Sequence, residues 1–237
     1  MEQSNWKQKL TPLDNEILLL KTELINMWQM VLSQLEKAQQ ALVKKDKDLA
    51  REVISTEKRV NGFELKIDRD CEDILALFAP VAVDLRFLLA VLKINMNLER
   101  TGDIAEGIAK FVINLPEKFD VQLFELTRII EMFNQANEMV AQVMEAFEKE
   151  DTVLARKIFK KDDLLDEINA NASAIVTDYI QKNPEQIDPA LYILSSIRKL
   201  ERVGDQAKNM AEEIIFYSEA KVLKHKPKSK KSQKDEE

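Results

Sequence analysis

The same six-residue motif occurs twice in this chain, about one hundred positions apart. Leu-Glu-Arg-Thr-Gly-Asp fills residues 98–103, and Leu-Glu-Arg-Val-Gly-Asp fills residues 200–205. A second pair of similar stretches, ALVKKDKDLAREVI and AFEKEDTVLARKIF, begins at Ala41 and at Ala146. The first pair is separated by 102 positions and the second by 105, so the copies differ by a few residues of loop or helix. Such self-similarity is the sequence signature of one structural unit used twice.

Each unit is expected to be built from helices. Only 4 of the 237 residues are glycine and 6 are proline, whereas Leu, Glu, Lys, Ala and Ile dominate, which is typical of long helices. In the first long segment, apolar residues recur at alternating spacings of three and four, which predicts the buried stripe of a bundle helix. These residues are Ile17, Leu20, Leu24, Met27, Val31, Leu35, Ala38 and Leu42.

Capping residues and prolines predict six long antiparallel helices, three in each unit. The predicted helices run from Thr11-Pro12 onward, from Asp46 or Asp48 to Phe78, from Pro80 towards Leu115, from about Val121 to Lys149, from Asp151 to about Gln181, and from Asp188-Pro189 onward. The predicted fold class is therefore all-α, with two tandem three-helix bundles related by duplication and a pseudo-twofold interface between them. We expect the first bundle to span residues 1–117 and the second to span residues 118–220.

The charge of the chain is unevenly distributed. The formal net charge is −7, but residues 221–237 hold seven lysines against three acids, which leaves about −11 on residues 1–220. The Lys-rich tail has few core-forming residues and is predicted to be a disordered, solubilising end. An acidic body repels the phosphates of nucleic acids and also free phosphate, so we expect no nucleic-acid partner.

Cysteine usage and hydropathy indicate a cytoplasmic protein. Cys71 is the single cysteine, so no intramolecular disulfide is expected, and its apolar neighbours predict a core position. The sequence that follows Met1 lacks the cationic and apolar regions of a signal peptide. The longest strongly apolar run, residues 74–83, is too short to span a bilayer. We therefore expect contact with a membrane only through partners.

The repeated motif has the character of a metal-binding element. Glu99 and Asp103 in the first copy, like Glu201 and Asp205 in the second, are separated by four residues and share one helix face. Like charges at this spacing repel each other, and a glycine inside a helix costs about 1 kcal/mol relative to alanine. A hard cation held by carboxylate oxygens would offset the repulsion, and the glycine would let another helix approach closely.

The second helix of each unit carries a similar pair of acids. Glu64 and Asp68 lie in FELKID, and Asp162 and Asp166 lie in DDLLDE. If the second and third helices pack antiparallel, each unit brings four carboxylates together, which is enough to hold one or more hard or borderline metal ions. The only histidine, His225, lies in the tail, which argues against a di-iron oxidase bundle with Glu-x-x-His ligands.

Two other interpretations of these acids are open. Acidic pairs at this spacing are common on solvated helix faces, where they form ordinary salt bridges. The basic residues available for such bridges are Arg100, Arg198, Lys199 and Arg202. A metal-dependent hydrolase is also conceivable, but it needs an open coordination position and a general base, and no additional histidine, lysine or nucleophile stands near the motifs.

These motifs resemble those of the PhoU family of phosphate-uptake regulators. The stretch FELKIDRDCEDILALFAPVAVDLRFLLAVLKINMNLERTGDIAEGIAKFV, residues 63–112, is similar to that family's first repeat, and KLERVGDQAKNMAEEIIFY, residues 199–217, is similar to the end of its second. The resemblance covers roughly residues 10–218. It implies that divalent or trivalent metal ions are bound by Glu64, Asp68, Glu99, Asp103, Asp162, Asp166, Glu201 and Asp205. Iron, zinc, manganese, magnesium and nickel are the candidates, and the sequence does not choose among them.

The resemblance also implies a function without catalysis. Such a protein is expected to be a cytoplasmic homodimer or higher oligomer that restrains phosphate uptake and the phosphate-starvation response. Its implied partners are the ATPase subunit of a phosphate ABC transporter and a phosphate sensor histidine kinase. An accessory subunit of another phosphate carrier is the alternative.

The two copies of the motif continue differently. The second continues with Asn209-Met210-Ala211-Glu212, close to the family pattern, whereas the first has Gly107-Ile108-Ala109-Lys110. This difference predicts that the first site binds fewer ions, or binds them more weakly. The second unit also has Pro189-Ala190-Leu191-Tyr192 in place of the Pro-Val-Ala segment, so partner contacts need not be symmetric.

Overall fold

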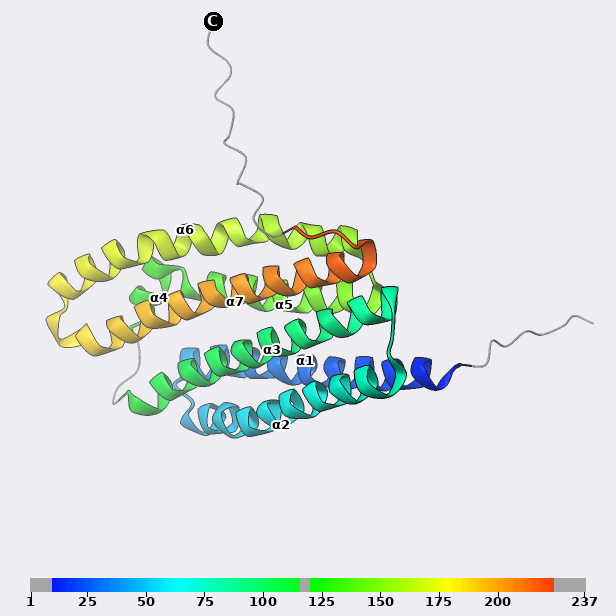
Figure 1. Ribbon diagram of the computed structural model, residues 1–237. Helices are drawn as coiled ribbons and strands as arrows, with labels where there is room; N and C mark the ends of the chain where they lie inside the picture. Colours follow the sequence, from blue (N-terminus) through cyan, green and yellow to red (C-terminus); the bar gives the residue numbers. More distant parts are fainter. Residues whose placement is uncertain (1–9, 116–119, 224–237) are drawn as a thin grey trace, which may run out of the picture.

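The computed structural model describes residues 10–115 and 120–223, and all regular structure in these two ranges is helical (Figure 1). The α-helices are α1 (Pro12–Lys44), α2 (Lys47–Phe78), α3 (Ala82–Asn114), α4 (Val121–Thr127), α5 (Ile129–Lys149), α6 (Thr152–Lys182) and α7 (Ile187–Glu219), and a 3-10 turn, η1, covers Pro184–Gln186. The all-α prediction is confirmed. In these ranges no helix combines the length and apolarity needed to cross a bilayer.

The helix starts predicted from capping residues are confirmed at three places. The Thr11 hydroxyl accepts a hydrogen bond from the Asp14 amide at 3.1 Å, and the Asp14 carboxylate accepts one from the Thr11 amide at 2.8 Å. The carboxylates of Asp46 and Asp151 cap α2 and α6 by accepting hydrogen bonds from backbone amides in the first turn. These bonds satisfy amides that have no partner within the helix, so a short side chain determines where each helix begins.

Two predicted helix starts are wrong. Pro80 does not begin α3, because Val81 is extended (φ −126°) and the helix starts at Ala82. Asp188 does not cap α7, because the 3-10 turn already leads the chain into a helix that starts at Ile187.

The prediction of one helix from Val121 to Lys149 is also wrong. Arg128 adopts a left-handed conformation (φ 55°) and divides this segment into α4 and α5, so there are seven α-helices in the described residues rather than six. The Arg128 guanidinium donates hydrogen bonds to Glu131 and to Glu167 of α6, each with a shortest distance of 2.7 Å. These side-chain contacts accompany a backbone conformation that a non-glycine residue rarely adopts.

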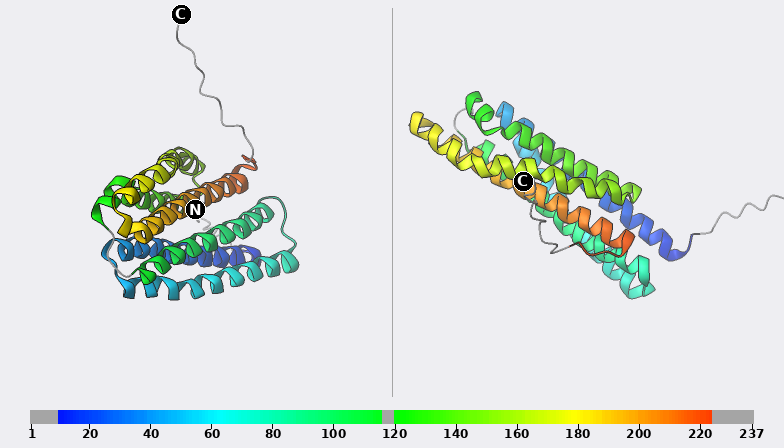
Figure 2. Two further views of the ribbon diagram at one scale, coloured as in Figure 1. Left: turned by 90° about the vertical axis from the view of Figure 1, so that its left-hand side faces the viewer. Right: turned by 90° about the horizontal axis from the view of Figure 1, so that it is seen from above.

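The helices form two bundles that lie against each other. α1, α2 and α3 make up the first, and α4 to α7 make up the second, as the left view in Figure 2 shows. Equivalent helices meet at the interface, where α3 packs antiparallel to α7, and α1 also contacts α5. Lys93 of α3 forms a salt bridge with Glu213 of α7 at 3.0 Å. This is the pseudo-twofold arrangement expected from the duplication.

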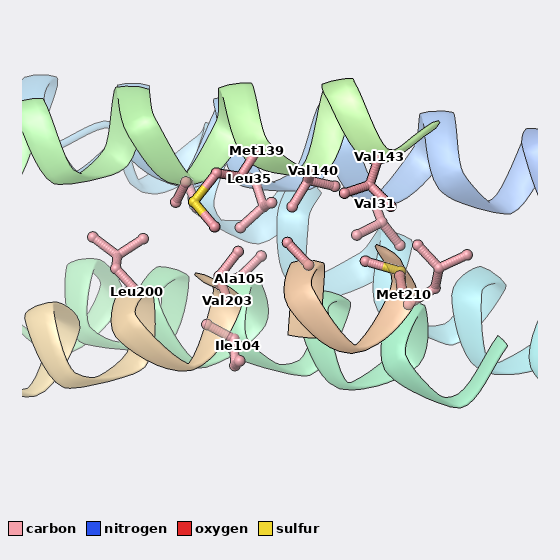
Figure 3. Close-up of a cluster of buried hydrophobic side chains, with 14 of the residues drawn as sticks. Val31, Leu35, Ile104, Ala105, Met139, Val140, Val143, Leu200, Val203 and Met210 are labelled. Carbon is pink, nitrogen blue, oxygen red and sulfur yellow. The ribbon is translucent and has the colours of Figure 1, made fainter. Parts of the chain in front are cut away.

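The two bundles share a continuous apolar core. Figure 3 shows Val31 of α1, Val140 and Val143 of α5, and Val203 and Met210 of α7 in one buried cluster. From Leu20 onward, the apolar stripe predicted for α1 is buried, and Cys71 is buried as predicted. The predicted bundle boundary between residues 117 and 118, and the predicted tail from residue 224 on, lie outside the described residues.

Candidate metal centre

The two motif glycines lie where helices of the same unit approach each other closely. A Cβ atom on Gly102 of α3 would lie 2.7 Å from Glu57 Oε2 of α2. A Cβ atom on Gly204 of α7 would lie 2.5 Å from Leu165 Cδ1 and 2.8 Å from Asp162 Oδ1 of α6. With contacts this short, a side chain at either position would force a neighbour to move, so close helix packing explains why glycine is used despite its low helix propensity.

The structure brings together the four carboxylates predicted in the first unit. Burial raises the pKa of Glu64, and the nearby carboxylates of Asp68 and Asp103 raise it further. Burial likewise raises the pKa of Glu99, with Asp103 and Glu64 adding to the effect. Asp68 accepts a hydrogen bond from Asn95 Nδ2 at 2.9 Å. Since each of these acids lies within electrostatic range of another, α2 and α3 together present a concentrated negative charge.

The four carboxylates of the second unit also gather, but a lysine lies among them. Burial raises the pKa of Glu201, and Asp205, Asp166 and Asp162 raise it further. The Lys208 ammonium forms salt bridges with Asp162 and, at 2.8 Å, with Asp205. The second cluster is therefore partly neutralised by the chain itself.

Lys208 is not among the salt-bridge partners predicted from the sequence. It lies three residues after Asp205, so the expectation that no additional lysine stands near the motifs is wrong. Within the described residues, Arg100, Lys199 and Arg202 form no salt bridge, and Arg198 reaches only the Ser173 hydroxyl, at 3.5 Å. The salt-bridge interpretation thus holds for part of the second cluster, through a residue one helical turn beyond the motif.

Glu57 is a buried acid of the first cluster that our sequence reasoning missed. Its side chain is 4% exposed, and Oε2 accepts a hydrogen bond from Gln34 Nε2 at 2.9 Å. Burial is the main cause that raises the pKa of Glu57 to about 7. The hydrogen bond from Gln34 lowers this pKa, whereas the nearby carboxylates of Asp103, Glu106 and Glu99 raise it. Glu57 is thus the most strongly perturbed carboxylate of this cluster.

A signal for Glu57 was present in the repeat. Asp46 and Asp151 cap equivalent helices, and Glu57 and Asp162 each lie eleven residues after their cap. Both acids approach the motif glycine of their own unit. Glu64 is therefore not the counterpart of Asp162, although the sequence indicates similar pairs on the second helices of the two units.

The side chains as they stand do not form a closed metal cage. Over residues 10–115 and 120–223, no group of three or more His, Cys, Asp or Glu residues is positioned to hold an ion. The donors nevertheless suit a hard cation, because Glu57 Oε1 and Asp162 Oδ1 are buried without a hydrogen-bond partner in the described structure and because the neighbouring acids repel one another. The carboxylates of the first unit suit a cation better, because those of the second unit already pair with the Lys208 ammonium.

Comparison with known proteins places the chain in a family. The profile of the PhoU domain matches residues 24–112 and again residues 129–214, one match in each bundle. The chain belongs to the PhoU family. It is 30% identical over 211 residues to the phosphate-specific transport system accessory protein PhoU homolog 1 of Thermotoga maritima, covering 89% of this chain and 90% of that protein. It is 31% identical to the phosphate-specific transport system accessory protein PhoU of Escherichia coli, and the match covers 89% of this chain and 86% of that protein.

Solved structures of PhoU proteins share the fold. The crystal structure of PhoU from Pseudomonas aeruginosa superposes with a TM-score of 0.84 at 30% identity, covering 88% of this chain and 99% of that one. The crystal structure of the phosphate transport system regulatory protein PhoU from Streptococcus pneumoniae gives a TM-score of 0.77 at 28% identity. This match covers 89% of this chain and 99% of that one. The resemblance noted in the motifs is therefore confirmed over most of the chain.

For this PhoU protein, we expect Glu57→Gln to remove a pH dependence of stability. The ordinary pKa of the carboxyl is 4.5 and its folded value is about 7, so ionisation disfavours the folded state. Folding is therefore weakened progressively as the pH rises from about 4.5 through about 7. At pH 8 the variant is expected to exceed the wild type by roughly 2 kcal/mol in free energy of unfolding, and near pH 4.5 to match it.

Urea denaturation in the presence of a chelator, repeated across this pH range, measures the effect. Glu72→Gln, which changes an exposed acid of the same helix, serves as the control and should run parallel to the wild type. Parallel curves for Glu57→Gln and the wild type would show that Glu57 is not buried in its charged form.

Proposed function

We propose that this chain is a cytoplasmic, metal-binding regulator that restrains phosphate uptake and the phosphate-starvation response. In this proposal it acts as an adaptor between the ATPase subunit of a phosphate ABC transporter and a phosphate sensor histidine kinase. Membership of the PhoU family and the names of its relatives, phosphate-specific transport system accessory proteins, support this role. PhoU proteins are accessory regulators rather than enzymes, so the hydrolase alternative is set aside.

The observation that supports the metal-binding part is that acids of two helices lie within electrostatic range of one another in each unit. The proposed ligands are Glu64, Asp68, Glu99 and Asp103 in the first unit and Asp162, Asp166, Glu201 and Asp205 in the second. Iron, zinc, manganese, magnesium and nickel are candidate ions. A bound ion would neutralise acids that now raise each other's pKa, and would link the second helix of a unit to its third.

Partner binding in this proposal uses surfaces outside the shared core. Leu77, Val81 and Val83, near the turn between α2 and α3, are 77%, 73% and 57% exposed. Apolar side chains gathered at one end of a bundle are typical of surfaces that bind other proteins. We propose that the chain functions as a homodimer or higher oligomer and is brought to the membrane only by its partners.

A phosphate-starvation reporter tests the regulatory role. In cells that lack the gene and grow in abundant phosphate, we expect the reporter to rise and the wild-type protein to restore repression. A variant with Glu99, Asp103, Glu201 and Asp205 changed to Ala is expected not to restore it. The purified wild type should also retain manganese after dialysis, measured by mass spectrometry, whereas this variant should lose it.

The matched control changes four acids that lie outside the clusters. Glu72, Asp73, Asp163 and Glu185 are all exposed, so replacing them by Ala alters the net charge equally without touching the proposed ligands. This control should repress like the wild type. Repression by the cluster variant would argue against a role for the carboxylates. An unchanged reporter after deletion would contradict the regulator and favour an accessory subunit of another phosphate carrier, which co-purified partners would identify.

A further inference from the structure

A pocket of about 300 Å³ lies between α3 and α7 and has a basic lining in an otherwise acidic molecule. We call it the basic groove. Its charged side chains are Arg100, Asp103, Glu106 and Lys110 from α3, and Lys199 and Arg202 from α7. Arg100 and Arg202 occupy the same position in the two copies of the motif. The groove is therefore shared by both units across the pseudo-twofold interface.

The basic side chains of the groove are only partly neutralised by other side chains of the chain. Lys110 pairs with Glu106 at 2.5 Å, so these two charges balance. In the described part of the chain, Arg100, Lys199 and Arg202 form no salt bridge, and Asp103 is the only other acid in the lining. Among the lining residues, three cations thus face one unpaired carboxylate, Asp103. Outside the lining, Arg100 lowers the pKa of its neighbour Glu99, whereas Asp103 raises it.

The Lys199 ammonium is held across the groove by α3. A Cβ atom on Gly107 would lie 2.6 Å from Lys199 Nζ and 3.0 Å from Cε, so glycine at this position gives the lysine its place. The same ammonium lies 5.9 Å from the centroid of the Phe111 ring, which is cation–π range. The equivalent of Gly107 in the second motif is Asn209, so this feature belongs to the first copy alone.

We propose that the basic groove binds a tetrahedral oxyanion of the phosphate class. Two guanidinium groups and an ammonium offer donors that match phosphate oxygens, because arginine binds phosphate with two parallel hydrogen bonds and lysine adds a point charge. The groove has room for an anion of this size. This inference deepens the proposed function and rests on it, since the groove would give a phosphate regulator a direct contact with its signal.

The location of the groove gives binding a structural consequence. An anion that contacts Arg100 and Arg202 together bridges α3 and α7, and so favours the arrangement of the two units that keeps both arginines within reach. The acidic body opposes anion binding at long range, which lowers the affinity of the groove for any anion. The oxyanion is either free inorganic phosphate or a phosphoryl group on a partner.

Isothermal titration calorimetry of the full chain, with a chelator present, tests the proposal with two probes. One probe is inorganic phosphate and the other is a short phosphoserine peptide, with the unphosphorylated peptide as blank. We expect at least one to bind. Arg100→Gln and Arg202→Gln should each weaken that binding about tenfold or more, because each removes a charge-assisted contact. Arg198→Gln, which changes an exposed neighbour outside the groove, should bind like the wild type.

Gly107→Ala tests the geometry without changing any charge. Its methyl group should displace the flexible Lys199 side chain and weaken binding while the helical circular dichroism stays unchanged. Binding of inorganic phosphate identifies the free ion as the source, and binding of the peptide alone identifies a partner. Absence of binding to both probes at millimolar concentration, or equal binding by the two arginine variants and the wild type, would overturn the proposal. Neither result depends on the reporter, so failure here is distinct from failure of the regulatory role.

Discussion

Replacing Trp28 with Ala is expected to lower the free energy of unfolding by about 4 kcal/mol. Trp28 is fully buried in α1, and its ring centroid lies 5.8 Å from that of Phe147 in α5. Its indole N–H donates a hydrogen bond to the Val140 carbonyl at 3.1 Å. The substitution would leave a large cavity and remove a buried hydrogen bond that links the first unit to the second.

Urea denaturation followed by circular dichroism measures this effect. Trp28→Phe keeps most of the apolar volume but loses the indole donor, so it should cost less than half as much. Leu77→Ala removes a side chain that is 77% exposed and should change stability little. A loss of less than about 1 kcal/mol for Trp28→Ala would contradict the close packing of α1 against α5.

Replacing Gly204 with Val is expected to lower the free energy of unfolding by about 3 kcal/mol. The first added carbon would lie 2.5 Å from Leu165 Cδ1 and 2.8 Å from the buried Asp162 carboxylate. Neither neighbour can move freely, since Leu165 is fully buried and Asp162 is held by Lys208. The helices α6 and α7 would have to separate, which would also spread the second carboxylate cluster.

Two glycines of the same chain provide controls for this prediction. Gly102→Val should cost less than Gly204→Val, because the nearest atom, at 2.7 Å, is the end of the longer Glu57 side chain. Gly62→Ala should gain up to about 1 kcal/mol, since no atom lies within 4 Å of its added carbon and alanine favours the helix. If Gly204→Val and Gly62→Ala had similar stability, the close approach at Gly204 would be wrong.

The functional site could be predicted only in part from the sequence. The spacing of Glu99 and Asp103, and of their counterparts, placed acids on one helix face, and the structure does gather these acids between two helices. Glu57 was missed because it forms no motif of its own and matters only through its burial beside Gly102. The pairing of Lys208 with Asp205 is local, but its second pairing, with Asp162, joins two helices across 46 residues and could not be predicted from spacing.

The features that could be predicted from the sequence alone are those that depend on short-range interactions. Thr11, Asp46 and Asp151 mark helix starts because each bonds to amides within three residues of itself. The repeat and the apolar periodicity predict two helical units with a buried face, because periodicity is a property of a single helix. These features needed no knowledge of how the helices pack.

Other features depend on contacts between segments that are distant in the sequence, and only the folded structure reveals them. The break at Arg128 carries no glycine signal and is accompanied by a hydrogen bond to Glu167 on another helix. The basic groove exists only because α3 and α7, about one hundred residues apart, pack antiparallel and bring Arg100 and Arg202 to one pocket. Local pattern cannot specify such arrangements, because the free energy that selects them comes from burial and pairing between helices rather than within one.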